Sequence, residues 1–539
     1  MSELYSRTDK KTSLFGLQVH GPVFFTSVSL ILMSIVLTLL YRDSASELFS
    51  VIQTQVSTKT GWFFILSVNV FLVFVVYLAF SKFGRVRLGG DEAKPEFSTL
   101  AWFSMLFSAG MGIGLLFWSI AEPVTHYLVP PLAAASDVQA AQQAMNVTML
   151  HWGFHAWAIY ALVGLSLAYF TYSRGLPLTI RSVFYPFFGN RIYSWVGDVI
   201  DIFAVLATVF GLATSLGFGV QQVASGLSFV LGIDNGLVTQ VSLIAGITLI
   251  ATISVVSGIQ KGVKFLSEMN MRIAVGLLLI IIILGPTVFI LNSFIQNTGS
   301  YVSHLLTWST WGESYAQGQW QNSWTVFYWG WWIAWSPFVG TFIARISKGR
   351  TIRQFILGVL IVPTIVTCLW ISAFGSVSIL EVMNGNTAIA DAVQNDVSTA
   401  LFVFLETIPF TEAISVLAIV LVTSFFITSS DSGSLVVDSL TSGGKISAPV
   451  GQRIFWATTE GAVAAVLLIG GGLQALQTAT IITGLPFAFL LLTMCYSLHK
   501  GLSQDLKKKK EAEKANAVTH AIPNSSTSKM TSETTDKVK

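Results

Sequence analysis

Residues 327–340 read FYWGWWIAWSPFVG, which places four tryptophans within seven positions and includes no charged side chain. The charge-free stretch extends over residues 324–344, about the 20-residue length that a helix needs to cross the hydrocarbon core of a bilayer. Tryptophans on a lipid-facing surface collect at the headgroup level, which four tryptophans spread around one helix cannot all reach. We therefore predict a transmembrane helix here, with some of its tryptophans pointing into the protein.

The composition of the whole chain agrees with a protein that lies in a membrane. Of its 539 residues, 53% are hydrophobic and 11% are charged, and the mean hydropathy is +0.69. Ordinary soluble enzymes carry about twice this share of charge, and disordered chains are far less hydrophobic, so both classes are excluded. The net charge of +3 gives no reason to expect nucleic acid as a partner. Cys368 and Cys495 lie in apolar runs, which indicates neither a disulfide nor a thiolate metal site.

Eleven further apolar stretches have the length of a membrane span. The expected fold is an all-α integral membrane protein with twelve transmembrane helices in a domain of residues 22–498. Residues 1–21 form a cytoplasmic segment before it, and residues 499–539 form a polar, Lys-rich tail that we expect to be disordered. The other eleven spans are placed at 22–41, 61–80, 99–118, 148–171, 195–225, 237–257, 271–294, 355–376, 413–436, 453–472 and 480–498.

Lysine and arginine are distributed unevenly among the connections, and this predicts the orientation. Positive residues in short loops stay on the cytoplasmic side during insertion. We therefore expect a multi-pass protein of the cell membrane with both termini in the cytoplasm. Lys507 to Lys510 in the tail either contact anionic lipid or are simply solvated. The Lys- and Arg-bearing connections lie near 82–94, 174–191, 261–264 and 345–353, and connections without either residue lie at 119–147, 295–323 and 377–412.

Two segments carry residues that interrupt helices. Residues 108–114 read SAGMGIG, with glycines at every second position, and residues 327–340 contain Gly330 and Pro337. Glycine weakens a helix and lets a ligand approach the backbone, and broken helices at membrane depth line cavities. An alternative for the glycine run is close packing of two helices.

Aromatic residues form two potential walls. Trp152, Trp157 and Tyr160 share one side of a helix at 100° per residue. In the tryptophan-rich helix, Trp332 lies three positions after Trp329, so their rings are neighbours on the helix surface. Inward-facing rings suit a ligand that carries positive charge without an N–H group, such as a quaternary ammonium ion. Ordinary core packing is the alternative.

Three polar patterns have competing interpretations. Residues 425–434 read FFITSSDSGS, whose hydroxyls either ligate Na⁺ with freed carbonyls or bond back to their own helix. His151 and His155 have a metal-like spacing, but without a Cys or carboxylate nearby we expect no metal there. Asp198 and Asp201 open a helix, where capping is favoured over a proton relay.

Several of these segments together resemble the betaine/choline/carnitine transporter family. The similar stretches are GMGIGLLFWSIAEP at 110–123, the Trp-rich run at 324–349, AVLATVFGLATSLGFGV at 204–220 and TSSDSGS at 428–434, in the same order over roughly residues 15–500. The resemblance implies a LeuT-like core after two extra helices. Helices 3–7 (about 99–294) and 8–12 (about 324–498) would form two inverted five-helix repeats, and a homotrimer would be usual.

The resemblance also implies functional residues. Trp152, Trp157, Tyr160 and Trp332 correspond to an aromatic box for a trimethylammonium group, and Trp335 resembles a tryptophan of the gate. With the glycine run and the other tryptophans of the eighth helix, the candidate substrate residues are Trp152, Trp157, Tyr160, Trp329, Trp331, Trp332, Trp335, Gly110, Gly112 and Gly114.

By the same resemblance, the third and tenth helices would share a sodium site. Its candidate residues are Ser108, Met111, Phe425, Thr428 and Ser429. Thr208 and Phe338 resemble part of a second sodium site. Leu212 stands where sodium-coupled betaine carriers have a further hydroxyl, so one sodium ion is the expectation.

The resemblance leaves three combinations of substrate and coupling mode open. Gly114 favours a zwitterion, because proton-coupled choline carriers of the family tend to have Asp there, and this predicts import of the osmolyte glycine betaine with Na⁺. Residues 201–211, DIFAVLATVFG, nevertheless look most like choline carriers, so proton-coupled choline uptake is the alternative. A carnitine/γ-butyrobetaine exchanger is less favoured: Val339 replaces the expected Met, although Arg272 opens the seventh helix. No covalent chemistry, and no cofactor beyond the coupling ion, is implied.

Overall fold

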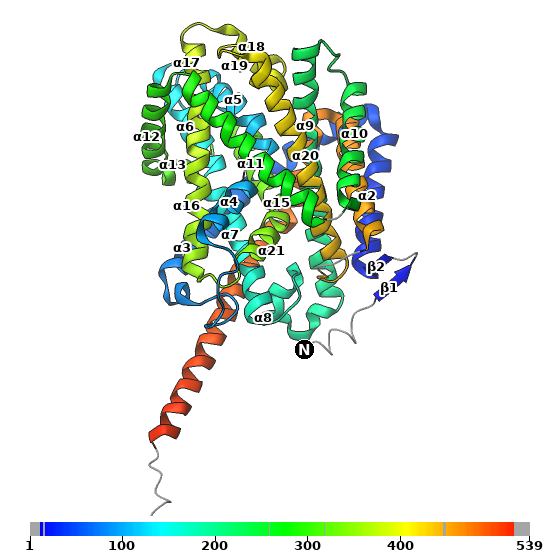
Figure 1. Ribbon diagram of the computed structural model, residues 1–539, viewed down its shortest axis with the longest axis vertical. Coiled ribbons are helices and arrows are strands. Elements are labelled where there is room, and N and C mark those ends of the chain that lie inside the picture. Colours follow the sequence, from blue (N-terminus) through cyan, green and yellow to red (C-terminus); the bar gives the residue numbers. More distant parts are fainter. Residues whose placement is uncertain are drawn as a thin grey trace, which may run out of the picture.

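The computed structural model describes residues 11–521 except 15–16, 111, 258, 317 and 446–448. It is a bundle of long, roughly aligned helices, from which the end of the last helix projects alone (Figure 1). The one sheet of the described residues is a hairpin of β1 (Lys11–Leu14) and β2 (Leu17–His20), which pair antiparallel with Lys11 opposite His20. This hairpin lies at the same end of the molecule as the projecting helix (Figure 1). The all-α fold class is otherwise confirmed.

The helices of the first half begin with two long apolar ones and end before residue 311. Their bounds are α2 Gly21–Leu40, α3 Arg42–Phe80, α4 Thr99–Gly110, α5 Ile113–Leu128, α6 Val138–Trp152, α7 Phe154–Ala168, α8 Tyr185–Phe188, α9 Trp195–Leu231, α10 Leu237–Ser257, α11 Ile259–Leu284, α12 Thr287–Ser303 and α13 Leu305–Thr310.

The second half contains the helix with the tryptophan-rich stretch, α15, and the longest helix, α21. The bounds are α14 Trp320–Ser323, α15 Thr325–Ile346, α16 Ile352–Ile371, α17 Val377–Met383, α18 Thr387–Asn395, α19 Ala400–Leu405, α20 Thr411–Thr441 and α21 Val450–Ala521. Helix α15 packs against α7, α9 and α21 and so lies at the centre of the bundle.

Among the described residues, nine helices are long and apolar enough to cross a membrane, so the chain is a multi-pass membrane protein. The predicted number of twelve spans is not reached by this criterion. The span predicted at 99–118 is divided between α4 and α5, the last two spans are joined in α21, and α15 is not among the nine helices. Helix α21 has a kink at Gly471 and Gly472, the last residues of the span predicted at 453–472. The φ of 56° at Gly472 favours glycine.

The predicted interruption at the glycine run is confirmed. Helix α4 ends at Gly110 and α5 begins at Ile113, with Gly112 in extended conformation between them. A second break, which the sequence analysis missed, separates α6 from α7 at Gly153. A Cβ atom there would lie 2.5 Å from both the Met149 carbonyl oxygen and the Tyr301 hydroxyl, so the close approach of these groups requires glycine.

The predicted interruption of the tryptophan-rich helix is wrong, because α15 continues through Pro337. A proline has no N–H to donate to the carbonyl four residues earlier, which here belongs to Ile333. The Ser336 hydroxyl donates to that carbonyl oxygen instead, at 2.7 Å. The hydroxyl therefore satisfies the acceptor that the proline leaves open.

The expectation of a disordered tail from residue 499 is wrong as far as Ala521, where α21 ends. The Arg174 guanidinium fixes this part of α21 by donating to both carboxylate oxygens of Asp505, at 2.8 and 3.1 Å. Burial lowers the pKa of Arg174, but its contacts with Asp505 and Tyr169 outweigh this effect and raise the pKa above its usual value. Lys509 extends the contact to Asp91, with 2.6 Å between Nζ and Oδ2.

Candidate functional site

A small cavity of about 30 Å³ lies where the break between α4 and α5 meets the tryptophan-rich helix α15. Pockets for small molecules usually have several hundred Å³, so its walls must part for a substrate to enter. None of the described residues that line the cavity is charged. They are Gly112, Ile113, Gly114, Leu115, Trp152, Ala156, Trp157, Tyr160, Ser215, Trp331, Trp332, Trp335 and Ser429.

Six of the thirteen described lining residues are aromatic and come from α6, α7 and α15. The Trp331 and Trp332 rings stack with 4.6 Å between centroids, and Trp152 meets Trp332 edge to face at 4.9 Å. Tyr160 on α7 contacts the Trp332 and Trp335 rings, at 6.3 Å from each. The two walls that the sequence predicted therefore face the same space.

Most of the predicted substrate residues line this cavity. Gly110 is the last residue of α4, and its surroundings lie outside what the structure describes. Trp329 lies outside the cavity and stacks on His155, with 5.7 Å between ring centroids. Ser215 on α9 also lines the cavity and was not predicted, because its contact with Trp331, whose Nε1 donates to the Ser215 hydroxyl at 3.3 Å, joins distant segments of the chain.

Gly114 gives the rings room to approach the backbone of α5. A Cβ atom at this position would lie 2.6 Å from Cη2 of Trp331 and 3.1 Å from Cη2 of Trp152. Any side chain at position 114, including Asp, therefore requires these rings to move.

The predicted sodium residues are only partly visible. Met111 and the side chain of Ser108 lie outside the described residues. Ser429 lines the cavity, and the neighbouring Thr428 hydroxyl contacts the Ser424 carbonyl oxygen at 3.0 Å and Asn270 Nδ2 of α11 at 3.1 Å. Phe425 is buried one turn before Thr428.

The residues named for a second sodium site make the following contacts. Thr208 is buried and its hydroxyl bonds back to the Ala204 carbonyl oxygen at 2.7 Å. Phe338 packs on Trp335, with 5.6 Å between ring centroids. The Leu212 side chain packs against Gly433 of α20, where a Cβ atom would lie 2.3 Å from Cδ1 of Leu212.

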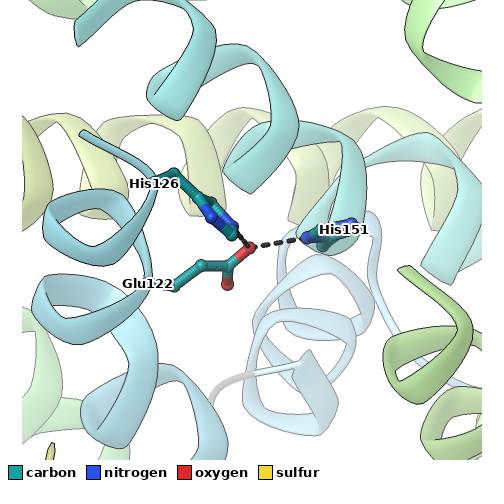
Figure 2. Close-up of side chains that lie close together, drawn as sticks. All are labelled: Glu122, His126 and His151. Carbon is teal, nitrogen blue, oxygen red and sulfur yellow. Dashed lines mark hydrogen bonds and ion pairs between the residues drawn. The ribbon is translucent and has the colours of Figure 1, made fainter. Parts of the chain in front are cut away.

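A fully buried polar cluster lies next to the aromatic wall. Glu122 and His126 come from α5, and His151 comes from α6 (Figure 2). Glu122 Oε1 lies 2.6 Å from His151 Nδ1 and 3.4 Å from His126 Nε2. Glu122 Oε2 accepts from Trp152 Nε1 at 2.8 Å and from the Tyr328 hydroxyl.

A carboxylate lies beside His151 after all, although none was expected near His151 and His155. Glu122, 29 positions earlier in the chain, places its Oε1 2.6 Å from His151 Nδ1. The metal-ligand atoms of Glu122, His126 and His151 lie within 4.8 Å of one another. His155 belongs to none of these contacts and stacks on Trp329.

Two further polar predictions change with the structure. Asp198 and Asp201 hold Arg181 rather than cap their helix: Arg181 Nη1 lies 3.0 Å from Asp198 and Arg181 Nε 2.5 Å from Asp201. Arg272 is exposed and pairs with Glu268, 3.7 Å away on the same helix. Exposed pairs of this kind contribute little, and Arg272 takes no part in the cavity.

A cavity in the middle of a multi-pass helical bundle, bounded by a broken helix and aromatic rings, is typical of a membrane transporter. The chain belongs to the betaine/carnitine/choline family of transporters, whose family model matches residues 22–507. It is therefore a transporter and not an enzyme.

Several curated relatives are similar over nearly the whole chain. A glycine betaine/proline/choline/ectoine transporter of Vibrio parahaemolyticus is 48% identical over 91% of this chain and 89% of its own length. A glycine betaine transporter of Acinetobacter baylyi is 45% identical over 95% of this chain and 78% of its own. The high-affinity choline transport protein of Escherichia coli is 43% identical, over 93% and 74% respectively.

Proposed function

We propose that this chain imports glycine betaine, or a close quaternary ammonium relative, together with Na⁺ by alternating access. The observation that carries this proposal is the aromatic cavity, whose described lining residues are uncharged. A trimethylammonium group has no N–H to donate, and ring faces attract it through their quadrupoles, by about 2 kcal/mol for a desolvated contact. Trp152, Trp157, Tyr160 and Trp332 bring four aromatic rings to the wall of this one small space.

The preference for a zwitterion rests on Gly114. A choline molecule lacks a carboxylate of its own, so an acidic residue in the site would favour it. The crowding of Trp331 and Trp152 against Gly114 leaves no room for Asp in this arrangement. The names of the Vibrio and Acinetobacter relatives agree with glycine betaine as a substrate of the family.

The proposed coupling to sodium rests on α20. Ser429 lines the cavity beside Thr428, so an ion held by these hydroxyls would lie next to the substrate and both would favour closure of the same walls. Proton-coupled choline uptake is the second candidate, supported by the similarity to the choline transport protein of Escherichia coli. The exposed position of Arg272 gives no support to a carnitine-type exchanger.

We extend the proposal to the architecture that the family implies: a LeuT-like inverted repeat after two extra helices, a homotrimer, and both termini in the cytoplasm. The hairpin β1–β2 and the projecting end of α21 lie at one end of the bundle, which supports the placement of both termini on the same side of the membrane (Figure 1). Lys507 to Lys510 of α21 would then lie near the anionic lipid of the inner leaflet.

A binding experiment tests the substrate proposal. Glycine betaine should change the tryptophan fluorescence of the purified protein in a saturable manner that requires Na⁺, whereas glycine, which lacks the methyl groups, should not. Equal responses to both compounds would contradict recognition of the trimethylammonium group by the aromatic cavity.

A further inference from the structure

Glu122 has an unusual position for a carboxylate in a membrane protein. It lies on α5, two turns beyond Gly114, and is fully buried. A buried carboxylate is costly unless its oxygens are hydrogen-bonded. An ionised carboxylate has about four acceptor positions, and four groups that can donate meet Glu122: His126, His151, Trp152 and Tyr328. The donor set therefore matches an ionised carboxylate.

Glu122 connects two different walls of the cavity. Trp152, which lines the cavity from α6, donates its Nε1 hydrogen to Glu122 Oε2 at 2.8 Å. The Trp332 Nε1 hydrogen, from α15, is accepted at 2.8 Å by the carbonyl oxygen of His151, whose ring is bonded to Glu122 Oε1. Each of these two tryptophans is thus one or two hydrogen bonds away from the same carboxylate.

Tyr328 strengthens the link on α15 without lining the cavity. Its hydroxyl donates to Glu122, and its ring packs on the Trp332 ring with 5.7 Å between centroids. The His151 ring stacks on the Tyr328 ring at 4.6 Å and contacts the Thr325 hydroxyl through Nε2 at 2.9 Å. The rings behind the cavity wall are therefore fixed by polar contacts that converge on Glu122.

We propose that Glu122 is a positioning residue for substrate recognition: it fixes the indoles of Trp152 directly and of Trp332 through His151, without touching the substrate. This inference rests on the proposed function in one respect, that the aromatic cavity binds the ammonium group. Ring faces attract a cation only when they are correctly placed, so loss of the carboxylate should weaken binding more than it slows transport.

Glu122→Gln tests this role, because the amide keeps the size of the side chain but replaces one acceptor oxygen with a donor group. We expect the half-saturating concentration of glycine betaine to rise at least tenfold, while maximal uptake per folded transporter falls less than threefold. Glu122→Asp, which keeps the charge but shortens the side chain, should recover part of the affinity. If wild type binds no betaine but takes up choline, the proposed substrate fails and the same comparison is made with choline.

Glu460→Gln is the matched control. Glu460 is also fully buried, but it lies on α21, and the Ser430 hydroxyl, 3.4 Å from Oε2, is its one described hydrogen-bond partner. We expect its half-saturating concentration to stay within twofold of wild type. Equal losses of affinity in both variants would overturn the proposal, because loss of any buried carboxylate would then have the same effect.

Tyr328→Phe tests the network from the opposite side and remains informative if Glu122→Gln fails to fold. It removes one donor to Glu122 and should raise the half-saturating concentration about threefold. Added to Glu122→Gln it should have no further effect, because both act through the same contact. Wild-type affinity in both single variants would overturn the proposal. So would zinc that copurifies stoichiometrically with wild type and is lost in Glu122→Gln, because the cluster would then be a metal centre.

Discussion

The two segments that the sequence marks as interrupted, the glycine run before α5 and the tryptophan-rich α15, behave differently in the structure. The helix breaks at the glycine run, between Gly110 and Ile113, whereas α15 continues through Pro337. The difference lies in the chemistry of the two residue types. Proline lacks an N–H, and the Ser336 hydroxyl satisfies the carbonyl that Pro337 leaves open, so α15 continues. Glycine keeps its N–H, but its conformational freedom weakens a helix, and Gly112 is in extended conformation. One segment therefore supplies backbone to the cavity and the other supplies a continuous wall of rings.

The largest effect is expected where the continuous wall meets the substrate. Trp332→Ala removes a ring face and the hydrogen bond to the His151 carbonyl oxygen, and should weaken glycine betaine binding on the order of 100-fold. Trp329→Ala, in the same helix but outside the cavity, is the control and should change affinity far less. The half-saturating concentration of uptake measures both. Similar losses in the two variants would mean that α15 acts through general packing.

A smaller effect is expected where the hydroxyls of α20 approach the broken helix. Thr428→Ala combined with Ser429→Ala removes two of the proposed oxygen ligands and should raise the sodium concentration for half-maximal uptake about tenfold. Thr441→Ala is the control, since its buried hydroxyl only bonds back within the same helix. An unchanged sodium requirement in the double variant would point to protons or exchange.

The glycine run itself allows a comparison of neighbouring positions. Gly114→Ala places a Cβ atom 2.6 Å from the Trp331 ring, and the displaced ring should raise the half-saturating betaine concentration about fivefold. In Gly112→Ala the nearest atom to the new Cβ is Cη2 of Trp335, at 3.9 Å, so the half-saturating betaine concentration should change less than twofold. A larger rise of the half-saturating concentration in Gly112→Ala than in Gly114→Ala would show that the glycines are needed for backbone flexibility rather than for close contact with the rings.

The smallest effect concerns the continuity of α15. Ser336→Ala leaves the Ile333 carbonyl oxygen without its donor, which should cost about 1 kcal/mol and lower the thermal unfolding midpoint by a few degrees. Ser434→Ala removes a hydroxyl of similar geometry in α20, where no proline follows, and should have no measurable effect. Equal midpoints for the two variants would remove the explanation given for the unbroken helix.

Patterns along the chain predicted the features that depend on local sequence. Glycine content predicted the break before α5. Helical periodicity placed Trp152, Trp157 and Tyr160 on one side of a single helix, which is wrong for Trp152, because the break at Gly153 puts it on α6 and the other two on α7. Contacts between distant segments could not be predicted in this way. Glu122 follows the glycine run by only two turns, yet its role depends on His151 and Tyr328, which reach it only through tertiary packing. The same is true of Arg181, which meets Asp198 and Asp201 across a connection that contains α8.

Sodium-coupled uptake of a zwitterion through the aromatic cavity can be measured with purified protein in liposomes. Radiolabelled glycine betaine and choline are offered in parallel, with an inward Na⁺ gradient or with a proton gradient alone. We expect betaine uptake that requires Na⁺ and is lost in Trp332→Ala. Choline uptake driven by protons alone, with no sodium-dependent betaine uptake, would contradict this expectation.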